Sequence, residues 1–171
     1  MVFFLIGFMG SGKTHWGKAW AKASDLNFVD LDEEIEKLEG RTINDIFETN
    51  GETYFRDLET KTLKNIILQN GAIISCGGGT PCYNDNLQWM NENGTTVYLK
   101  ATPALLAERL LNEKDRRPLI KDIQNDQLPR FIEQKLRGRE LFFNKAKIIV
   151  DARETNINTF LTISNPSTFS N

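Results

Sequence analysis

The sequence predicts an α/β protein, with a five-stranded parallel sheet in a three-layer, doubly wound arrangement. Short apolar runs alternate along the chain with longer segments whose apolar residues recur at helical spacing. The first run leads directly into a glycine-rich motif that binds phosphate in many proteins. With 171 residues and 40% hydrophobic side chains, the chain can bury one core without a disulfide or a structural metal. We therefore expect a single domain over residues 1–164.

Five apolar runs have the composition of buried strands. Parallel strands that are covered on both faces are almost continuously apolar, because neither face contacts water. The runs are also rich in β-branched and aromatic side chains, which favour strands. The expected strands are residues 2–6, 28–29, 72–74, 96–99 and 148–150.

Helical patterns fill the intervals between these runs. The first predicted helix covers residues 13–23. A longer one is expected where apolar residues share a helix face, namely Phe55, Leu58, Leu63, Ile66 and Ile67. Another begins at Thr102 and Pro103, because threonine caps helices well and proline fits the first turn. The polar residues 165–171 are expected to form a loose tail.

Residues 7–14 read Gly-Phe-Met-Gly-Ser-Gly-Lys-Thr and match the pattern G-x-x-x-x-G-K-[ST] at every defined position. This motif predicts a nucleoside triphosphate site. Glycines allow the backbone to curve around phosphate oxygens, which would receive N–H groups from Gly10, Ser11, Gly12 and Lys13. The Lys13 ammonium would reach the β and γ phosphates, and the Thr14 hydroxyl would ligate Mg²⁺.

Two carboxylates follow the second predicted strand in the sequence Asp30-Leu31-Asp32. If the chain is extended there, a period of two directs both side chains to the same side. One carboxylate could then hold Mg²⁺ through water while the other orients an acceptor hydroxyl. The alternative is a helix N-terminus that Asp32 caps.

An arginine and a glutamate in the segment Gly51-Glu52-x-x-Phe55-Arg56-x-x-Glu59 are spaced to form a pair on one helix face. A paired arginine is held in place and suits the binding of a substrate carboxylate, although an ordinary surface ion pair has the same spacing. The glycines at 77–79 follow the third predicted strand. They permit close approach of the backbone to a ligand, or simply a tight turn.

Basic residues gather in the C-terminal third of the chain, at Arg109, at Arg116 and Arg117, and at Arg137 and Arg139. A basic loop beside a phosphate site suggests a mobile lid, here over about residues 112–125, whose arginine meets the γ-phosphate. A solvated loop is the alternative interpretation.

The overall composition argues against several classes of partner. The net charge is −2, and the basic residues of the C-terminal part are too few and too unaligned to argue for nucleic acid. No apolar run approaches the roughly 20 residues of a membrane span. Nothing resembles a signal peptide, and Cys76 and Cys82 lack the spacing of a metal site. We expect a monomeric cytoplasmic protein with reduced thiols and with neither nucleic-acid nor membrane partners.

The ordered set of motifs resembles the shikimate kinase family from about Val2 to Asp151. The matching features are the phosphate loop, Asp30-Leu31-Asp32, Gly51-Glu52 with Phe55-Arg56 and Glu59, Gly77-Gly78-Gly79, Arg117-Pro118-Leu119, and Arg139 before Phe142-Phe143 and Ala146. The resemblance implies a fold of the P-loop kinase type. It also implies transfer of the γ-phosphoryl group of ATP to the 3-hydroxyl of shikimate, with Mg²⁺, in the pathway to chorismate and the aromatic amino acids.

For the phosphate donor, the resemblance implies that Lys13 and the lid residue Arg117 are catalytic and contact the phosphates. Thr14 and Asp30 would serve the metal. Arg109 and Arg153 lie where the family contacts adenine.

For the acceptor, the resemblance implies that shikimate binds mainly to a region over about residues 31–60. Asp32 would bind and deprotonate or orient the hydroxyl, and Arg56 and Arg139 would clamp the carboxylate. Gly78 and Gly79 would offer backbone groups to the ring. A tyrosine is usual in the family where this chain has Phe142-Phe143, and the nearby Arg137 is an alternative to Arg139.

Chemistry alone leaves three rival functions open. A gluconate kinase or a nucleoside monophosphate kinase would place another acceptor against Asp32 and Arg56. A nucleotide-dependent regulatory module would hydrolyse ATP slowly without an organic acceptor, and would have no use for two separated arginines and a glycine turn.

Overall fold

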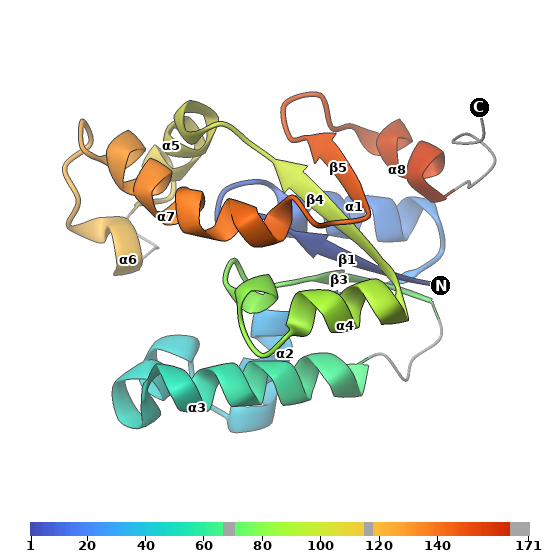
Figure 1. Cartoon of the computed structure of the whole chain (residues 1–171), viewed down its shortest axis with the longest axis horizontal. Coiled ribbons are helices and arrows are strands. Elements are labelled where there is room, and N and C mark those ends of the chain that lie inside the picture. Colours follow the sequence, from blue (N-terminus) through green and yellow to red (C-terminus); the bar gives the residue numbers. More distant parts are fainter. Residues whose placement is uncertain (67–70, 115–117, 165–171) are drawn as a thin grey trace.

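The computed structural model describes residues 1–66, 71–114 and 118–164, and its centre is a five-stranded sheet (Figure 1). Every neighbouring pair of strands is parallel, in the order β2-β3-β1-β4-β5. The strands are β1 Val2–Ile6, β2 Asn27–Asp30, β3 Ala72–Ser75, β4 Thr95–Lys100 and β5 Ile148–Asp151. Each contains one of the five apolar runs, so the predicted fold class is confirmed.

Helices connect the strands and cover both faces of the sheet. They are α1 Lys13–Ala23, α2 Leu31–Glu39, α3 Ile43–Ile66, the short 3₁₀ helix η1 Thr80–Cys82, α4 Asn86–Asn93, α5 Pro103–Leu111, α6 Pro118–Lys121, α7 Leu128–Phe143 and α8 Ile157–Ser164. The helix predicted over residues 13–23 is confirmed, as is the start of α5, where the Thr102 hydroxyl accepts a hydrogen bond from the Leu105 N–H at 3.3 Å. Ile67 and the tail expected over residues 165–171 lie outside the described residues.

Aromatic contacts show which helices share a face of the sheet. Successive residues of a strand point to opposite faces. Phe3 packs edge-on against Phe160 of α8, with ring centroids 4.8 Å apart, whereas Phe4 packs against Trp89 of α4 at 6.1 Å. Phe160 also stacks on Trp20 of α1 at 5.5 Å. Helices α1 and α8 therefore form one outer layer and α4 lies in the other, as the three-layer prediction requires.

Helix α3 contains a break at Gly51, where φ is 80° and ψ is 174°. A positive φ of this size is far more accessible to glycine than to other residues. The turns after the break carry Glu52, Arg56 and Glu59 at spacings of three and four residues, so the three side chains lie on one side of the helix.

Three neighbouring strands bring distant parts of the sequence to one edge of the sheet. Ser75, the last residue of β3, is in register with Leu5 of β1 and Asp30 of β2. The segments that follow these strands are the phosphate motif, the glycine turn at 77–79 and the start of α2. In the part of the chain that the structure describes, no helix is long and apolar enough to cross a membrane.

Candidate active site

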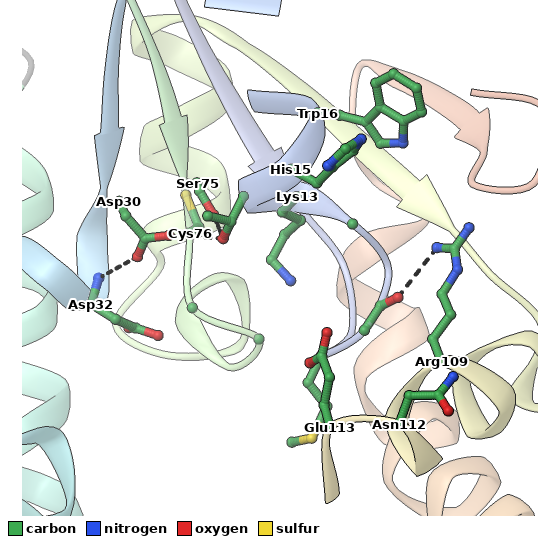
Figure 2. Close-up of a pocket in the computed structure, with 16 residues that line it drawn as sticks. Lys13, His15, Trp16, Asp30, Asp32, Ser75, Cys76, Arg109, Asn112 and Glu113 are labelled. Carbon is green, nitrogen blue, oxygen red and sulfur yellow. Dashed lines mark hydrogen bonds between the residues drawn. The ribbon is translucent and has the colours of Figure 1, made fainter. Parts of the chain in front are cut away.

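A cavity of about 540 Å³ lies at the carboxyl ends of β1, β2 and β3 (Figure 2). Figure 2 shows Lys13 at its centre, with Asp30 and Asp32 on one side and Arg109 on the other. The lining residues are Met9, Gly10, Gly12, Lys13, Thr14, His15, Trp16, Asp30, Asp32, Ser75, Cys76, Gly77, Gly78, Arg109, Asn112 and Glu113. The phosphate motif and both predicted carboxylates thus face one space.

The phosphate motif forms a tight loop between β1 and α1. Gly10 and Gly12 adopt positive φ values of 79° and 99°, which glycine supplies at little cost. The Lys13 ammonium donates to the carbonyls of Gly7 at 2.9 Å and Phe8 at 3.0 Å. Ser11 differs from its neighbours, because its side chain is buried and its N–H donates to the Phe8 carbonyl at 3.2 Å.

Hydroxyl and carboxylate oxygens meet beside the start of α1. The Thr14 hydroxyl donates to Asp30 Oδ2 at 2.9 Å, and its oxygen lies 3.3 Å from Ser75 Oγ. Hard oxygen donors of this kind suit Mg²⁺, which usually keeps several waters and takes few protein ligands. The residues therefore fit the magnesium site expected at Thr14 and Asp30. Sequence reasoning missed Ser75, although a hydroxyl residue ending an apolar run was a usable signal.

Asp30 ends β2 in an extended conformation, but the chain does not stay extended as far as Asp32, so the predicted period of two does not apply. Helix α2 already begins at Leu31, and Asp30 is its cap, accepting a hydrogen bond from the Asp32 N–H at 3.2 Å. The alternative of a cap at Asp32 is also wrong by two residues. Both carboxylates still line the cavity because Asp32 occupies the first turn of the helix.

Asp32 lies in an environment that disfavours its charge. Burial, followed by repulsion from the carboxylates of Asp30 and Glu59, raises the pKa of Asp32 from 3.8 to about 6, although Lys13 acts in the opposite direction. A carboxyl group with a pKa near the working pH is suited to exchanging a proton with a hydroxyl.

A second cavity of about 420 Å³ adjoins the first and reaches α3 and α7. Its lining comprises Met9, Asp32, Glu33, Glu36, Thr42, Ile43, Asn44, Phe47, Phe55, Arg56, Glu59, Gly77, Gly78, Gly79, Leu119 and Arg139. The two cavities share Met9, Asp32, Gly77 and Gly78. Asp32 therefore borders both cavities at once.

Arg56 is held by two glutamates, Glu52 and Glu59. The helical spacing predicted the pair with Glu59. Its Nη1 donates to Glu59 Oε2 at 2.9 Å. Its Nε and Nη2 both donate to Glu52 Oε1, at 3.3 and 3.1 Å. The side chains of Arg56 and Glu59 are only 12% and 1% exposed, so the alternative of an ordinary surface ion pair does not apply.

Arg139, rather than Arg137, faces the second cavity. Arg139 Nη1 donates to the Gly78 carbonyl at 3.3 Å, and its guanidinium lies over the Phe8 ring. The Arg137 side chain is 80% exposed and pairs with Glu133 on the outer side of α7. Of the two arginines that the sequence left open, only Arg139 can meet a ligand held against the glycine turn.

The glycine turn lies close to both arginines, and its contacts leave little room for a side chain at Gly77 and Gly79. A Cβ atom at Gly79 would lie 2.8 to 3.0 Å from the Arg56 guanidinium, and one at Gly78 would lie 3.4 Å from Arg139 Nη1. At Gly77 a Cβ would lie 2.9 Å from Glu59 Oε1 and 3.0 Å from Asp32 Oδ1. The turn is thus a close approach of backbone to charged side chains, and not merely a tight bend.

Arg109 connects the phosphate loop to the segment after β5. Its Nη1 donates to the carbonyls of Gly10 at 3.2 Å and Ser11 at 3.1 Å, and its Nη2 donates to the Ala152 carbonyl at 3.0 Å. Arg153 is exposed and lines neither of the two cavities. Arg117 lies outside the described residues, as does the centre of the lid expected over about residues 112–125. The catalytic role of Arg117 and the lid itself therefore remain predictions.

Comparison with known proteins identifies the relatives of this site. A family model described as shikimate kinase matches residues 9–164. A shikimate kinase from Azobacteroides pseudotrichonymphae genomovar. CFP2 is 46% identical over 159 residues, which cover 92% of this chain and 94% of the relative. The crystal structure of shikimate kinase from Bacteroides thetaiotaomicron has a TM-score of 0.89 at 37% identity, covering 96% of both chains. Shikimate kinase from Acinetobacter baumannii, solved in complex with shikimate, has a TM-score of 0.83 at 29% identity and covers 99% of this chain and 95% of its own.

A gluconokinase from Sinorhizobium meliloti represents one of the rival functions. It has a TM-score of 0.53 at 18% identity, over 94% of this chain and 86% of its own. Likeness at this level shows a shared fold alone.

Proposed function

Because this chain belongs to the shikimate kinase family, and so transfers a phosphoryl group from ATP to shikimate, we propose roles for its residues in that reaction. The cavity at the phosphate loop binds ATP and the adjoining cavity binds shikimate. The observation that carries this assignment is the position of Asp32, which borders both cavities. A phosphoryl group has to pass between two such spaces at the point where they join.

On the donor side, the phosphate loop and Lys13 bind the β and γ phosphates. Phosphoryl transfer depends mainly on positioning and on neutralising charge, so Lys13 is placed to act on the group in transit. Thr14, Asp30 and Ser75 would hold Mg²⁺, which supplies charge neutralisation on the phosphates when bound. Arg109 fixes the loop through its carbonyls and borders the nucleotide space.

On the acceptor side, Arg56 and Arg139 bind the shikimate carboxylate. Guanidinium groups form paired hydrogen bonds with carboxylates, and these two approach the glycine turn from α3 and α7. Backbone groups of Gly78 and Gly79 contact the ring. Asp32 accepts a hydrogen bond from the 3-hydroxyl and, with a pKa of about 6, is mostly ionised at pH 7 and able to take its proton.

We expect the protein to act as a monomer.

The carboxylate assignment is tested with Arg56→Lys, which keeps the charge but loses the paired hydrogen bonds. We expect shikimate binding to weaken by about 1 to 3 kcal/mol, which raises KM for shikimate roughly 5- to 150-fold and leaves KM for ATP unchanged. Arg137→Lys is the matched control, because Arg137 is exposed on the outer side of α7, and it should change neither constant. A loss confined to ATP, or equal effects of both variants, would contradict the assignment.

A further inference from the structure

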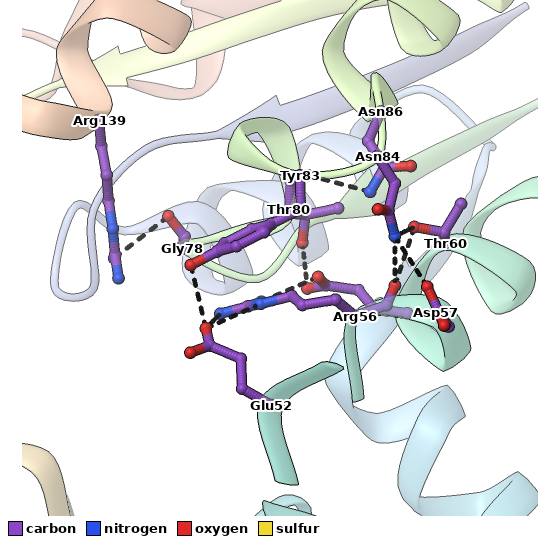
Figure 3. A network of polar contacts seen from close by, with 11 residues as sticks. Glu52, Arg56, Asp57, Thr60, Gly78, Thr80, Tyr83, Asn84, Asn86 and Arg139 are labelled. Atoms are coloured by element: carbon purple, nitrogen blue, oxygen red, sulfur yellow. Dashed lines mark hydrogen bonds and ion pairs between the residues drawn. The ribbon is translucent and has the colours of Figure 1, made fainter. Parts of the chain in front are cut away.

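Tyr83, which follows η1, contacts the acceptor site without lining either cavity (Figure 3). Its ring lies against the Arg56 guanidinium, with 4.2 Å between Cζ and the ring centroid, and its hydroxyl donates to Glu52 Oε1 at 3.0 Å. Glu52 Oε1 is the same oxygen that accepts from Arg56 Nε and Nη2. The Tyr83 hydroxyl and the Arg56 guanidinium together lower the pKa of Glu52 below its usual value.

The next residue fixes the Tyr83 backbone against the same part of α3. Asn84 Nδ2 lies 3.2 Å from the Arg56 carbonyl, 3.0 Å from Thr60 Oγ1 and 3.3 Å from Asp57 Oδ1. Asn84 also has a positive φ of 50°, a conformation that asparagine tolerates better than most residues. The segment after the glycine turn is therefore anchored to the backbone of the residue whose guanidinium Tyr83 covers, as Figure 3 shows.

These contacts limit which N–H groups of the Arg56 guanidinium are left for a ligand. A guanidinium carries five N–H groups. The hydrogen bonds within the described residues use Nε and Nη2 for Glu52 and Nη1 for Glu59, which leaves one N–H on each Nη nitrogen. N–H groups on the two Nη nitrogens can together serve as a fork that binds both oxygens of a carboxylate. Because the Nη atoms also face Gly79, this fork lies at the glycine turn.

We propose that Tyr83 is a positioning residue, which holds the Arg56 guanidinium and Glu52 in the arrangement that presents this fork to the acceptor carboxylate. The proposal rests on the proposed function of Arg56. The stacked ring restricts rotation of the guanidinium out of its plane, and the hydroxyl holds the Glu52 carboxylate on the Nε side. Phe55 and Phe47 also approach the guanidinium, at 5.0 and 5.9 Å, but neither has a hydroxyl for Glu52.

A role in packing alone explains Tyr83 less well. Tyr83 is 38% exposed, so its side chain contributes little to the core. The turn around it has other supports, because Asn86 Nδ2 donates to the Thr80 carbonyl at 3.1 Å and the Cys82 N–H donates to the Gly79 carbonyl at 2.8 Å. Removing the Tyr83 ring should therefore leave the turn in place.

The test compares Tyr83→Leu, which lacks the ring, with Tyr83→Phe, which keeps the ring but loses the hydroxyl. We expect Tyr83→Leu to raise KM for shikimate about 3- to 10-fold, with kcat and KM for ATP within about twofold of wild type. Tyr83→Phe should recover most of the loss. Tyr54→Leu is the control, because Tyr54 lies on α3, is 40% exposed and donates to Glu39, away from Arg56. Tyr83→Thr replaces the leucine variant if that variant does not fold.

A second measurement asks whether Tyr83 acts through Arg56. In an Arg56→Gln background, Tyr83→Leu should add less than about twofold to KM for shikimate, because no guanidinium is left to position. The same increase in both backgrounds would overturn the proposal, as would an equal effect of Tyr54→Leu. If Arg56→Gln raises KM but Tyr83→Leu does not, the positioning role is wrong and the proposed function stands. If Arg56→Gln leaves KM for shikimate unchanged, the assignment of Arg56 is wrong and the positioning role fails with it.

Discussion

Asp32→Asn should make the ligand-free protein more stable while removing nearly all of its turnover. The carboxyl group of Asp32 is buried and lies near the carboxylates of Asp30 and Glu59, so its ionisation opposes folding. Asparagine has almost the same shape and carries no charge. The substitution therefore removes an electrostatic cost that the wild type bears at neutral pH, and it also removes the group that would accept the proton.

The size of the effect follows from the pKa. A rise from 3.8 to about 6 corresponds to about 3 kcal/mol that the ionised carboxyl costs the folded protein at pH 7 and above. For a domain of this length, one kcal/mol shifts Tm by roughly 2 to 4 °C, so we expect Tm to rise by about 6 to 12 °C.

The gain should depend on pH with a definite sign. Between pH 3.8 and about 6 the folded protein binds a proton at Asp32 that the unfolded chain releases. The stabilisation by this proton is complete below pH 3.8 and is lost as pH rises through about 6. The advantage of Asp32→Asn over wild type should thus be greatest at pH 7 to 8 and should disappear near pH 4.

Thermal unfolding of both proteins without ligands, at half-unit steps from pH 4.5 to 8, measures this difference. Glu48→Gln provides the control, because it removes one carboxylate from an exposed position of α3 and should not change Tm. A variant no more stable than wild type at pH 7.5 would refute the electrostatic argument. So would a gain that stays constant across the pH range.

Four further predictions follow from the site. Lys13→Ala should reduce kcat at least 100-fold while the far-UV circular dichroism stays unchanged, and turnover within a few-fold of wild type would contradict its role. Gly79→Ala should raise KM for shikimate about tenfold, since its Cβ would lie 2.8 Å from the restrained Arg56 guanidinium; an unchanged KM would show that Arg56 moves freely. Arg109→Ala should raise KM for ATP about tenfold and leave KM for shikimate unchanged, and equal effects would argue against a role in fixing the loop. Below pH 6, kcat/KM for shikimate should fall about tenfold per pH unit as Asp32 becomes protonated, and a flat profile would mean that its ionised form is not required.

Much of the fold could be predicted because its signals are local. Buried parallel strands must be apolar on both faces, so each strand could be located from its own apolar run, without knowing which strands pair with it. The loop over residues 7–14 is equally local, because its conformation needs glycine at fixed positions. Arg56 and Glu59 were predicted to pair for the same reason, since helical spacing alone brings them together.

Features that depend on contacts between distant segments could not be read in this way. The start of α2 at Leu31, by contrast, was missed for a local reason, because the Asp30 carboxylate caps the helix and the chain does not stay extended as far as Asp32. Ser75 reaches Thr14 only through the order of the strands. Tyr83 contacts Arg56 from 27 positions away in the sequence, and nothing in its local sequence distinguishes it from an exposed aromatic residue.

The strand order places the proposed phosphate loop and two of the proposed acceptor residues on different connections of the sheet. The loop proposed to bind phosphate follows β1, whereas α2 and α3, which carry the proposed acceptor residues Asp32 and Arg56, form the connection between β2 and β3. Hydrogen-bonded neighbouring strands lie about 4.8 Å apart, and this spacing depends on the backbone and not on side chains. Because β3 lies between β1 and β2, the sheet backbone sets the distance between the phosphate loop and the connection that follows β2. A different connection after β2 could therefore change which alcohol is recognised, while the distance over which the phosphoryl group is transferred stays the same.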